Sequence, residues 1–310
     1  MKLDKKDTDK IAVLYNLGEV KSVRLLSGGM ISYNYVVKTS KGEFIVRKLG
    51  YKIEGWWARQ KELEFEVVEY LHKKSFPYQI PRFIKNNKGD YISKLHGNLF
   101  EAYERIPGRK IVKLNDKQFR EMAKALAIYH KIIKSFPLRE KFRRIDDYKW
   151  MLGKYSLLRK AKPETKLDKL MLNNLDFYED LLKRLLKYDL KQNPLVNHSD
   201  FSVYNLLWKK DKLVGVLDFE NVSYKPRVSD IAYLLRRSNR KKMLINTYRK
   251  YGSLSKEEEK NLIVYLLFNF CNRFWWTYLE MKKRPDLKYN GLLRAVKDGR
   301  KYAKMLKELK

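Results

Sequence analysis

The apolar residues change their spacing once along this chain, and that change limits the fold more than any other feature. Between Val20 and Val46, apolar and polar residues alternate in three segments joined by turns. A period of two predicts strands, so we expect a small antiparallel sheet here. One helical stretch, 59–74, and two more strand-like stretches, 90–95 and 98–106, follow.

The remainder of the chain has mainly helical spacing. Two residue pairs have the spacing of capping boxes, which mark helix starts: Asn115 with Gln118, and Ser255 with Glu258. The sequence therefore predicts an α+β protein with a β-rich lobe containing one helix over residues 1–102. A larger, mainly helical lobe is expected over residues 103–310.

Composition restricts the class of protein. The N-terminal residues are charged and lead into no apolar segment, and the longest apolar run, Leu262–Phe270, is too short to span a membrane. Cys271 is the single cysteine, which excludes disulfides and a cysteine-based zinc site. We expect a cytoplasmic protein with no membrane insertion.

The net charge is +33, from 69 Lys and Arg against 36 Asp and Glu. Such a charge attracts anions, among them nucleotides and nucleic acids. The lysines are spread from end to end without a basic tail, however, so we interpret most of the charge as a general surface property.

Two polar segments flank a predicted hairpin. Asp200 and Asn205 lie in "NHSDFSVYN", and Asp218 follows Asn205 by thirteen residues, in "LDFEN". The stretch between them, "LLWKKDKLVGVL", alternates on either side of a charged turn and predicts a β-hairpin. Its two ends should bring Asn205 and Asp218 side by side as oxygen ligands suited to Mg²⁺. Asp200 can then accept a proton from an attacking hydroxyl, a division of roles typical of phosphoryl transfer.

These segments resemble the aminoglycoside phosphotransferase and choline kinase family, small-molecule relatives of the protein kinases. His198, Asp200 and Asn205 match the family's H-x-D-x-x-x-x-N loop, and Asp218 with Glu220 matches its D-x-E motif. Asp230 matches an Asp that precedes an apolar helix. The resemblance implies a two-lobed protein-kinase-like fold, with ATP and Mg²⁺ as cofactors and a small-molecule hydroxyl as acceptor.

The resemblance also implies where the nucleotide binds. The loop that carries Ser27, Gly28, Gly29 and Ser32 takes the place of the loop that covers the phosphates. The connection after the sheet should present the backbone of about Glu101–Tyr103 to the adenine.

A cation from the third strand should reach the α- and β-phosphates. Arg47 is the expected residue, although a register error of one would exchange it with Lys48. Its partner acid on the following helix should be Glu64, with Glu62 and Glu66 as alternatives.

Two residues near Asp200 add to the prediction of which side chains catalyse. His198 is expected to organise the loop rather than to catalyse. Ser202 stands where protein serine/threonine kinases usually carry a lysine, which favours a small-molecule kinase. We therefore predict catalytic roles for Asp200 and Ser202.

The acceptor is expected to be neutral, zwitterionic or anionic, such as a homoserine-like compound or a sugar. Five cations soon after the catalytic region disfavour polycationic aminoglycosides: Arg236, Arg237, Arg240, Lys241 and Lys242. Choline or ethanolamine stays an alternative, because Trp275 and Trp276 could supply an aromatic cage. A non-enzymatic protein that binds nucleic acid through its basic surface is less favoured.

Overall fold

The computed structural model describes residues 3–26, 32–143, 148–188, 192–236, 238–283 and 290–304. Contacts among them divide the chain into two compact units. The first unit contains Met1–Glu121 and Val203–Val222, and the second contains Met122–Ser202 and Ser223–Lys310. The lobe boundary expected at residue 102 stays a prediction.

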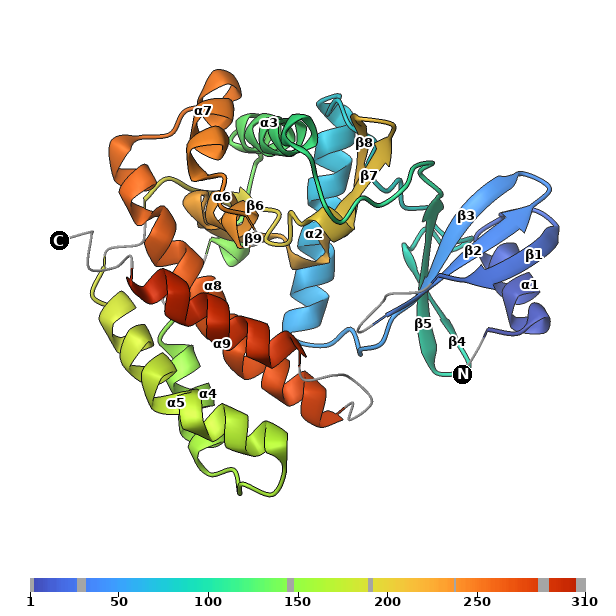
Figure 1. The fold of residues 1–310 in the computed structure, drawn as a ribbon. Coiled ribbons are helices and arrows are strands. Elements are labelled where there is room, and N and C mark those ends of the chain that lie inside the picture. Colours follow the sequence, from blue (N-terminus) through green and yellow to red (C-terminus); the bar gives the residue numbers. More distant parts are fainter. Residues whose placement is uncertain are drawn as a thin grey trace. The chain divides into compact units, whose positions relative to one another are not determined.

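An antiparallel sheet of five strands forms the centre of the first unit, in the order β1-β2-β3-β5-β4 (Figure 1). Its strands confirm the period-two pattern and the predicted α+β class. Their bounds are Val20–Leu25 (β1), Tyr33–Thr39 (β2), Gly42–Lys48 (β3), Ile92–Leu95 (β4) and Asn98–Glu104 (β5).

One face of this sheet is covered by a helix that the sequence pattern did not predict, α1 (Lys5–Leu14). Ile11 and Tyr15 pack there against alternate residues of β2 and β3, including Val37 and Val46. Because neighbouring residues of a strand point to opposite faces, Arg47 is directed away from this apolar core. Because side chains alternate between the two faces along each strand, the polar side chain of Arg47 lies on the second face of the sheet.

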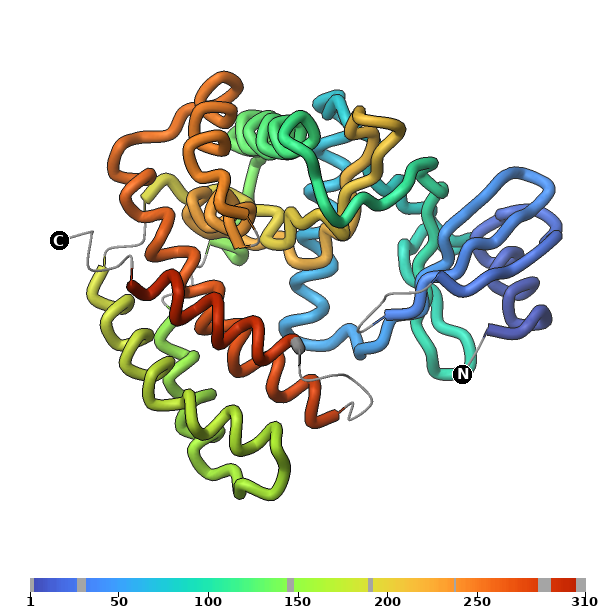
Figure 2. Tube along the Cα trace, viewed as in Figure 1, coloured from blue at the N-terminus to red at the C-terminus, as the bar shows by residue number. Residues whose placement is uncertain are grey.

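The second face is approached by α2 (Trp56–Lys73) and by the end of a hairpin made of β7 (Leu206–Lys209) and β8 (Lys212–Val216). The hairpin confirms the prediction made from "LLWKKDKLVGVL". It is fixed to the segment after α2, because Gln79 donates its N–H to the Val214 carbonyl and accepts from the Val216 N–H. The course of the chain through α2 and the hairpin can be followed in Figure 2. Short 3-10 turns precede and follow it: Val203–Asn205 (η2) and Phe219–Asn221 (η3).

The second unit is mainly helical, as predicted. Its long helix α8 (Lys256–Lys283) packs against helices on several sides (Figure 1). Strand β6 (Pro194–Asn197) leads into the loop of residues 198–202, which we call the polar loop. This strand pairs with β9 (Ser223–Pro226), which follows η3. The other elements are α3 (Asp116–Ile133), which begins in the first unit, η1 (Glu140–Phe142), α4 (Trp150–Arg159), α5 (Lys166–Leu185), α6 (Val228–Leu235), α7 (Lys241–Tyr251) and α9 (Asn290–Ala303).

Both predicted capping boxes are present. Asn115 and Gln118 exchange side-chain to backbone hydrogen bonds at the start of α3, and Ser255 and Glu258 do so at the start of α8. Within the described ranges, no helix has the length and apolar character needed to cross a membrane.

Candidate active site

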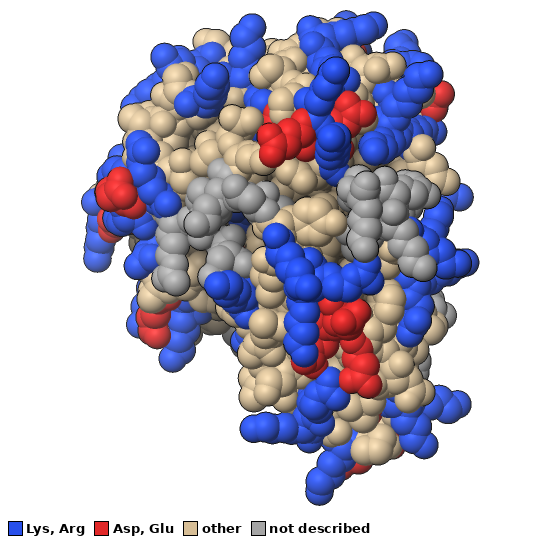
Figure 3. Space-filling model, turned by 90° about the vertical axis from the view of Figure 1, so that its left-hand side faces the viewer, with Lys and Arg blue, Asp and Glu red and all other residues tan. Residues whose placement is uncertain are grey.

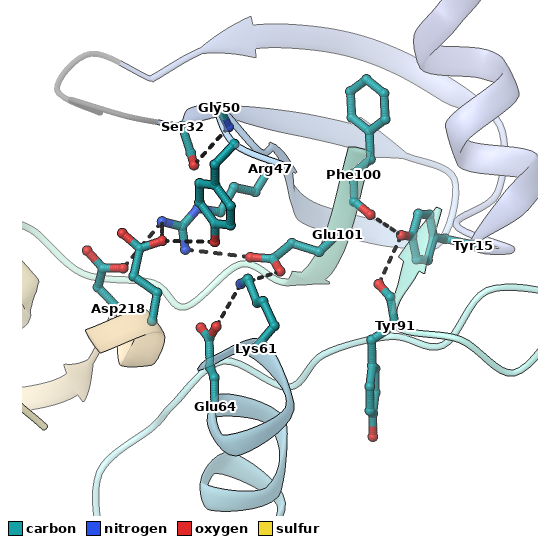
Figure 4. A network of polar contacts seen from close by, with 12 residues as sticks. Tyr15, Ser32, Arg47, Gly50, Lys61, Glu64, Tyr91, Phe100, Glu101 and Asp218 are labelled. Carbon is teal, nitrogen blue, oxygen red and sulfur yellow. Dashed lines mark hydrogen bonds and ion pairs between the residues drawn. The ribbon is translucent and has the colours of Figure 1, made fainter. Parts of the chain in front are cut away.

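A cluster of charged side chains lies on the polar face of the sheet in the first unit (Figure 4). We call it the carboxylate cluster. Its members are Arg47 of β3, Lys61 and Glu64 of α2, Glu101 of β5, and Asp218 and Glu220, which follow β8.

Arg47 holds the two acids of the D-x-E motif. Its Nη2 lies 2.5 Å from Oε2 of Glu220 and 3.4 Å from Oδ1 of Asp218. Its Nη1 lies 3.5 Å from Oε1 of Glu101, the residue paired with it across the β3–β5 ladder. Burial lowers the pKa of Arg47, but Glu220, Asp218 and Glu101 outweigh it and raise that pKa well above its usual value. In this register Arg47, and not Lys48, points into the cluster.

Lys61 is a second buried cation, which the sequence analysis missed. Its Nζ lies 2.7 Å from both Glu64 and Glu101, and the residue is only 2% exposed. Glu64 is therefore the buried acid of the helix, but its close partner is Lys61 and not Arg47. The sequence did contain the i, i+3 spacing of Lys61 and Glu64, yet nothing in it indicated that the pair is buried.

Carboxylates outnumber cations in the cluster. Four acids face two bases, so the formal charge is −2 when all six groups are ionised. Burial raises the pKa of Glu64 to about 7, against the opposing charge of Lys61, and burial also raises the pKa of Glu220. Oε1 of Glu101 is buried and accepts no hydrogen bond from the described residues. The cluster is thus an environment that favours additional positive charge.

Asn205 lies at one end of the hairpin, and Asp218, a member of the cluster, lies at the other. The Leu217 N–H donates to the Asn205 carbonyl at 2.8 Å, so the backbones at the two ends of the hairpin are in contact. The pairing of the Asn205 and Asp218 side chains as metal ligands stays a prediction. Asp218 has a φ of 67°, in the left-handed region that non-glycine residues seldom adopt. Such a conformation is uncommon away from turns and functional sites.

The polar loop of the second unit is held by Asp230. Its Oδ2 accepts the His198 N–H at 2.7 Å, and its Oδ1 accepts the Ser199 N–H at 2.8 Å. Ser199 has a φ of 63°, a conformation that these two hydrogen bonds stabilise. Asp200 comes next in the chain, and its Oδ1 accepts a hydrogen bond of 2.6 Å from the Tyr233 hydroxyl.

His130 supports Asp230 from behind the loop. Its Nε2 lies 3.2 Å from Oδ2 of Asp230, and its Nδ1 lies 2.7 Å from the Tyr248 hydroxyl. A carboxylate can only accept, so Nε2 carries the proton and the tyrosine hydroxyl donates to Nδ1. Burial lowers the pKa of His130, although Asp230 opposes this effect. His130 is therefore neutral at pH 7.

Three further residues that the sequence singled out are His198, Ser202 and Trp275. His198 is fully buried, and its Nδ1 accepts the Asp200 N–H at 3.3 Å, an arrangement that suits an organising residue. Ser202 is buried and donates its N–H to the Asp200 carbonyl at 2.8 Å. Trp275 packs edge-on against Trp150 of α4.

The expected nucleotide-binding residues are only partly described. Ser27, Gly28 and Gly29 lie outside the described residues, while Ser32 is buried and accepts the Gly50 N–H at 3.4 Å. Glu101 and Tyr103 lie within β5, opposite residues of β3. The Ala102 carbonyl between them accepts the Ile84 N–H, so part of this backbone is already used by the sheet.

A family model described as a phosphotransferase enzyme family matches residues 22–259. The chain belongs to this family. The sequence-based prediction of a small-molecule kinase is thereby confirmed at the level of the family.

Two curated relatives are similar along most of the chain. The homoserine kinase of Methylobacillus flagellatus is 23% identical over 70% of this chain and 64% of its own length, so the match spans just under two thirds of that relative. The homoserine kinase of Zymomonas mobilis subsp. mobilis is 24% identical over 80% of this chain and 78% of its own.

Solved structures agree on the fold. A microcompartment-associated aminopropanol kinase superimposes with a TM-score of 0.74 at 16% identity, covering 99% of this chain and 98% of that one. An amicoumacin kinase in complex with AMP-PNP and Ca²⁺ gives a TM-score of 0.71 at 15% identity, with 96% and 92% covered. The protein-kinase-like fold is therefore confirmed.

Replacing Lys61 tests the balance of charge in the cluster. Lys61→Met keeps the length of the side chain but leaves Glu64 and Glu101 without their shared cation. Removing one partner of a buried ion pair costs about 3–5 kcal/mol, so we expect the free energy of unfolding to fall by that order in urea titrations. Lys73→Met, at an exposed position of the same helix, is the control and should change little. Equal urea midpoints for the two variants would contradict the assigned network.

The support of the polar loop by neutral His130 predicts an acid-dependent loss of stability. Below about pH 6.5 the histidine of the unfolded chain binds a proton, whereas the folded chain, with its lowered pKa, does not. The unfolded state then holds more protons, so the free energy of unfolding falls as pH falls, by at most about 1.4 kcal/mol per pH unit. Urea titrations between pH 7 and pH 5 should show a smaller slope for His130→Gln than for the wild type. An unchanged slope would refute a neutral buried His130.

Proposed function

We propose that this protein is an ATP- and Mg²⁺-dependent kinase that transfers the γ-phosphoryl group to a hydroxyl of a small molecule. The observation that carries the proposal is the surplus of carboxylates in the cluster around Arg47, at the end of the hairpin that joins Asn205 to Asp218. The family supports the reaction class, and the AMP-PNP in the amicoumacin kinase structure supports a nucleotide substrate.

Mg²⁺ suits the donor set of this region. Asp218 and Asn205 offer carboxylate and amide oxygens, the hard ligands that Mg²⁺ prefers. A divalent cation would also balance the formal charge of −2 that the cluster has when all six groups are ionised. Among the described residues, no three His, Cys, Asp or Glu side chains are already arranged around a metal position. We therefore infer that phosphate oxygens and water complete the coordination. The bound ion would neutralise charge on the β- and γ-phosphates.

Arg47 has two roles in this proposal. Without nucleotide it neutralises Asp218 and Glu220, at the distances given above. With nucleotide and metal bound, Asp218 would serve as a metal ligand and the guanidinium of Arg47 would bind the α- and β-phosphates. Glu101, which Lys61 also contacts, keeps Arg47 in position, and Glu64 fixes Lys61. Ser27, Gly28, Gly29 and Ser32 are proposed to cover the phosphates with backbone N–H groups.

Asp200 acts on the acceptor. The acceptor oxygen forms a bond to the γ-phosphorus as the bond between that phosphorus and the β–γ bridging oxygen breaks, and ADP leaves. The hydroxyl proton passes to the Asp200 carboxylate, which the Tyr233 hydroxyl orients through Oδ1. Ser202, whose N–H bonds the Asp200 carbonyl, helps to fix the backbone of the base.

The acceptor is proposed to be neutral, zwitterionic or anionic. Two relatives are homoserine kinases and one structural neighbour is an aminopropanol kinase, and each of these names indicates a small acceptor that carries a hydroxyl. A polycationic aminoglycoside is disfavoured by the net charge of +33. Lys and Arg are spread over the face shown in Figure 3, with Asp and Glu among them, which does not favour a dedicated nucleic-acid surface there.

An acceptor-dependent assay tests the proposal. Production of ADP with Mg²⁺ and a panel of small alcohols, hydroxy acids and amino-acid alcohols should rise above hydrolysis by water for at least one acceptor. Asp200→Asn preserves shape but removes the base, and it should lower the acceptor-dependent kcat by about 10²–10⁴-fold. Asp180→Asn, the same change at an exposed site on α5, should leave kcat unchanged. No turnover with any acceptor, together with tight, salt-sensitive RNA binding, would replace the kinase with a nucleic-acid-binding function.

A further inference from the structure

A surface cavity of about 360 Å³ lies in the second unit, between α3 and the last turn of α7 with the residues that follow it. The two helices lie side by side (Figure 1), joined by the hydrogen bond of 2.7 Å between the Tyr248 hydroxyl and Nδ1 of His130. The described lining residues include none from the polar loop or the carboxylate cluster. The cavity is thus separate from the proposed active site, and its volume suits a small ligand.

The described walls of this cavity contain five cations and no acid. Lys131 and Lys134 belong to α3, Arg249 and Lys250 to the last turn of α7, and Arg227 precedes α6. The whole chain has 36 acids beside its 69 cations, so a wall without any acid differs from the general mixture of charges. A concave surface lined by one sign of charge concentrates ions of the opposite sign.

The two arginines of the cavity have acidic partners outside its lining. Arg227 lies 2.6 Å from Glu258, and Arg249 lies 2.8 Å from Glu259. Arg227 also donates to the Ser253 hydroxyl at 3.2 Å, which connects the two sides of the cavity. These contacts fix the shape of the walls and leave the lysines as the source of unbalanced charge.

Three ammonium groups supply that charge. Lys131, Lys134 and Lys250 are exposed, and their side chains form no ion pair or hydrogen bond with the residues that the structure describes. Lys131 and Lys134 lie three residues apart and therefore on one side of α3. Lys250 faces the same cavity from α7. Three unpaired positive charges around one small cavity favour a ligand with two or more negative charges.

We propose that this cavity binds a small anion of the phosphate or pyrophosphate class, either free or as part of a phosphorylated metabolite. Phosphate groups offer several acceptor oxygens and up to two charges each, which ammonium groups bind as point charges. A nucleic acid fits less well, because the cations gather in one cavity and not along an extended stripe. The inference goes beyond the proposed kinase activity and does not rest on it.

The cavity shares two side chains with the support of the polar loop. Tyr248 and His130 line it, and Nε2 of His130 lies 3.2 Å from Oδ2 of Asp230. The walls come from α3, α7 and the residue before α6, so the site exists only in the folded chain. A ligand that binds the folded chain alone stabilises it by mass action. An anion in the cavity should therefore raise the Tm.

Thermal unfolding of the full chain gives the first test. The Tm should be measured with pyrophosphate, with inorganic phosphate and with KCl at equal ionic strength, in the presence of EDTA. We expect a saturable rise in Tm that is larger for pyrophosphate than for phosphate and absent with KCl. Calorimetry should then give the Kd of pyrophosphate.

Replacing the three lysines tests where the anion binds. The triple variant Lys131→Gln, Lys134→Gln, Lys250→Gln keeps polar side chains of similar length but removes the unbalanced charge. The Kd of pyrophosphate should rise by at least about tenfold, since each exposed ion pair that is lost weakens binding about twofold or more. All three positions are exposed, so the Tm without anions should stay close to that of the wild type.

A second triple variant controls for net charge. Lys160→Gln, Lys162→Gln and Lys169→Gln remove the same charge from exposed positions of the second unit that do not line the cavity. This variant should bind pyrophosphate with the Kd of the wild type. An equal loss of affinity in the two triple variants would mean general attraction by the basic surface and would overturn the proposal.

The remaining outcomes are equally decisive. If neither phosphate nor pyrophosphate raises the Tm above its value in KCl, the cavity is not an anion site. Unchanged affinity in the cavity variant would place the bound anion elsewhere on the chain. Binding of an RNA oligonucleotide more tightly than pyrophosphate, lost in the cavity variant alone, would replace the small anion with a nucleic acid. No outcome depends on ADP production, so failure of the kinase assay and failure of this site are distinguishable.

Discussion

The contacts of Arg47 connect more elements of the first unit than those of any other residue described above. β3 supplies the guanidinium, β5 supplies Glu101, and the end of the hairpin supplies Asp218 and Glu220. Lys61 then connects Glu101 to Glu64 of α2. Because the acids outnumber the bases, this buried group is not a self-sufficient ion network. The carboxylate cluster lacks positive charge when its acids are ionised, and this is the physical reason for expecting a divalent cation there. The same side chains that connect the sheet, α2 and the hairpin are therefore proposed to support catalysis.

The polar loop of the second unit depends on one carboxylate. Asp230 accepts two successive backbone N–H groups, which fixes the left-handed conformation of Ser199 and thereby the position of Asp200. Neutral His130 and Tyr248 complete this support from the side away from the loop. The Asp200 carboxylate is thus oriented by the backbone of the loop as well as by the Tyr233 hydroxyl. The left-handed conformation of Ser199 is a local strain next to the residue proposed as the base.

Patterns within short segments predicted much of this molecule. The alternation in β2 and β3, the two capping boxes and the hairpin between Asn205 and Asp218 are all set by neighbours in the sequence. Lys61 was missed because burial of an i, i+3 pair depends on β5, forty residues further along the chain. Helix α1 was missed because "KKDTDKIAVL" is largely charged and becomes a helix by packing Ile11 against the sheet. The cavity between α3 and α7 likewise became visible only with the fold.

The metal dependence of nucleotide binding tests the central claim most directly. Affinity for a non-hydrolysable ATP analogue should be measured by calorimetry, with Mg²⁺ and with EDTA, for the wild type and for Asp218→Asn. We predict that Mg²⁺ strengthens binding at least about tenfold in the wild type, which is about 1.4 kcal/mol of binding free energy, and has little effect in the variant. Equal Mg²⁺ dependence in the two proteins would contradict the claim that the carboxylate cluster holds the metal of a phosphoryl-transfer site.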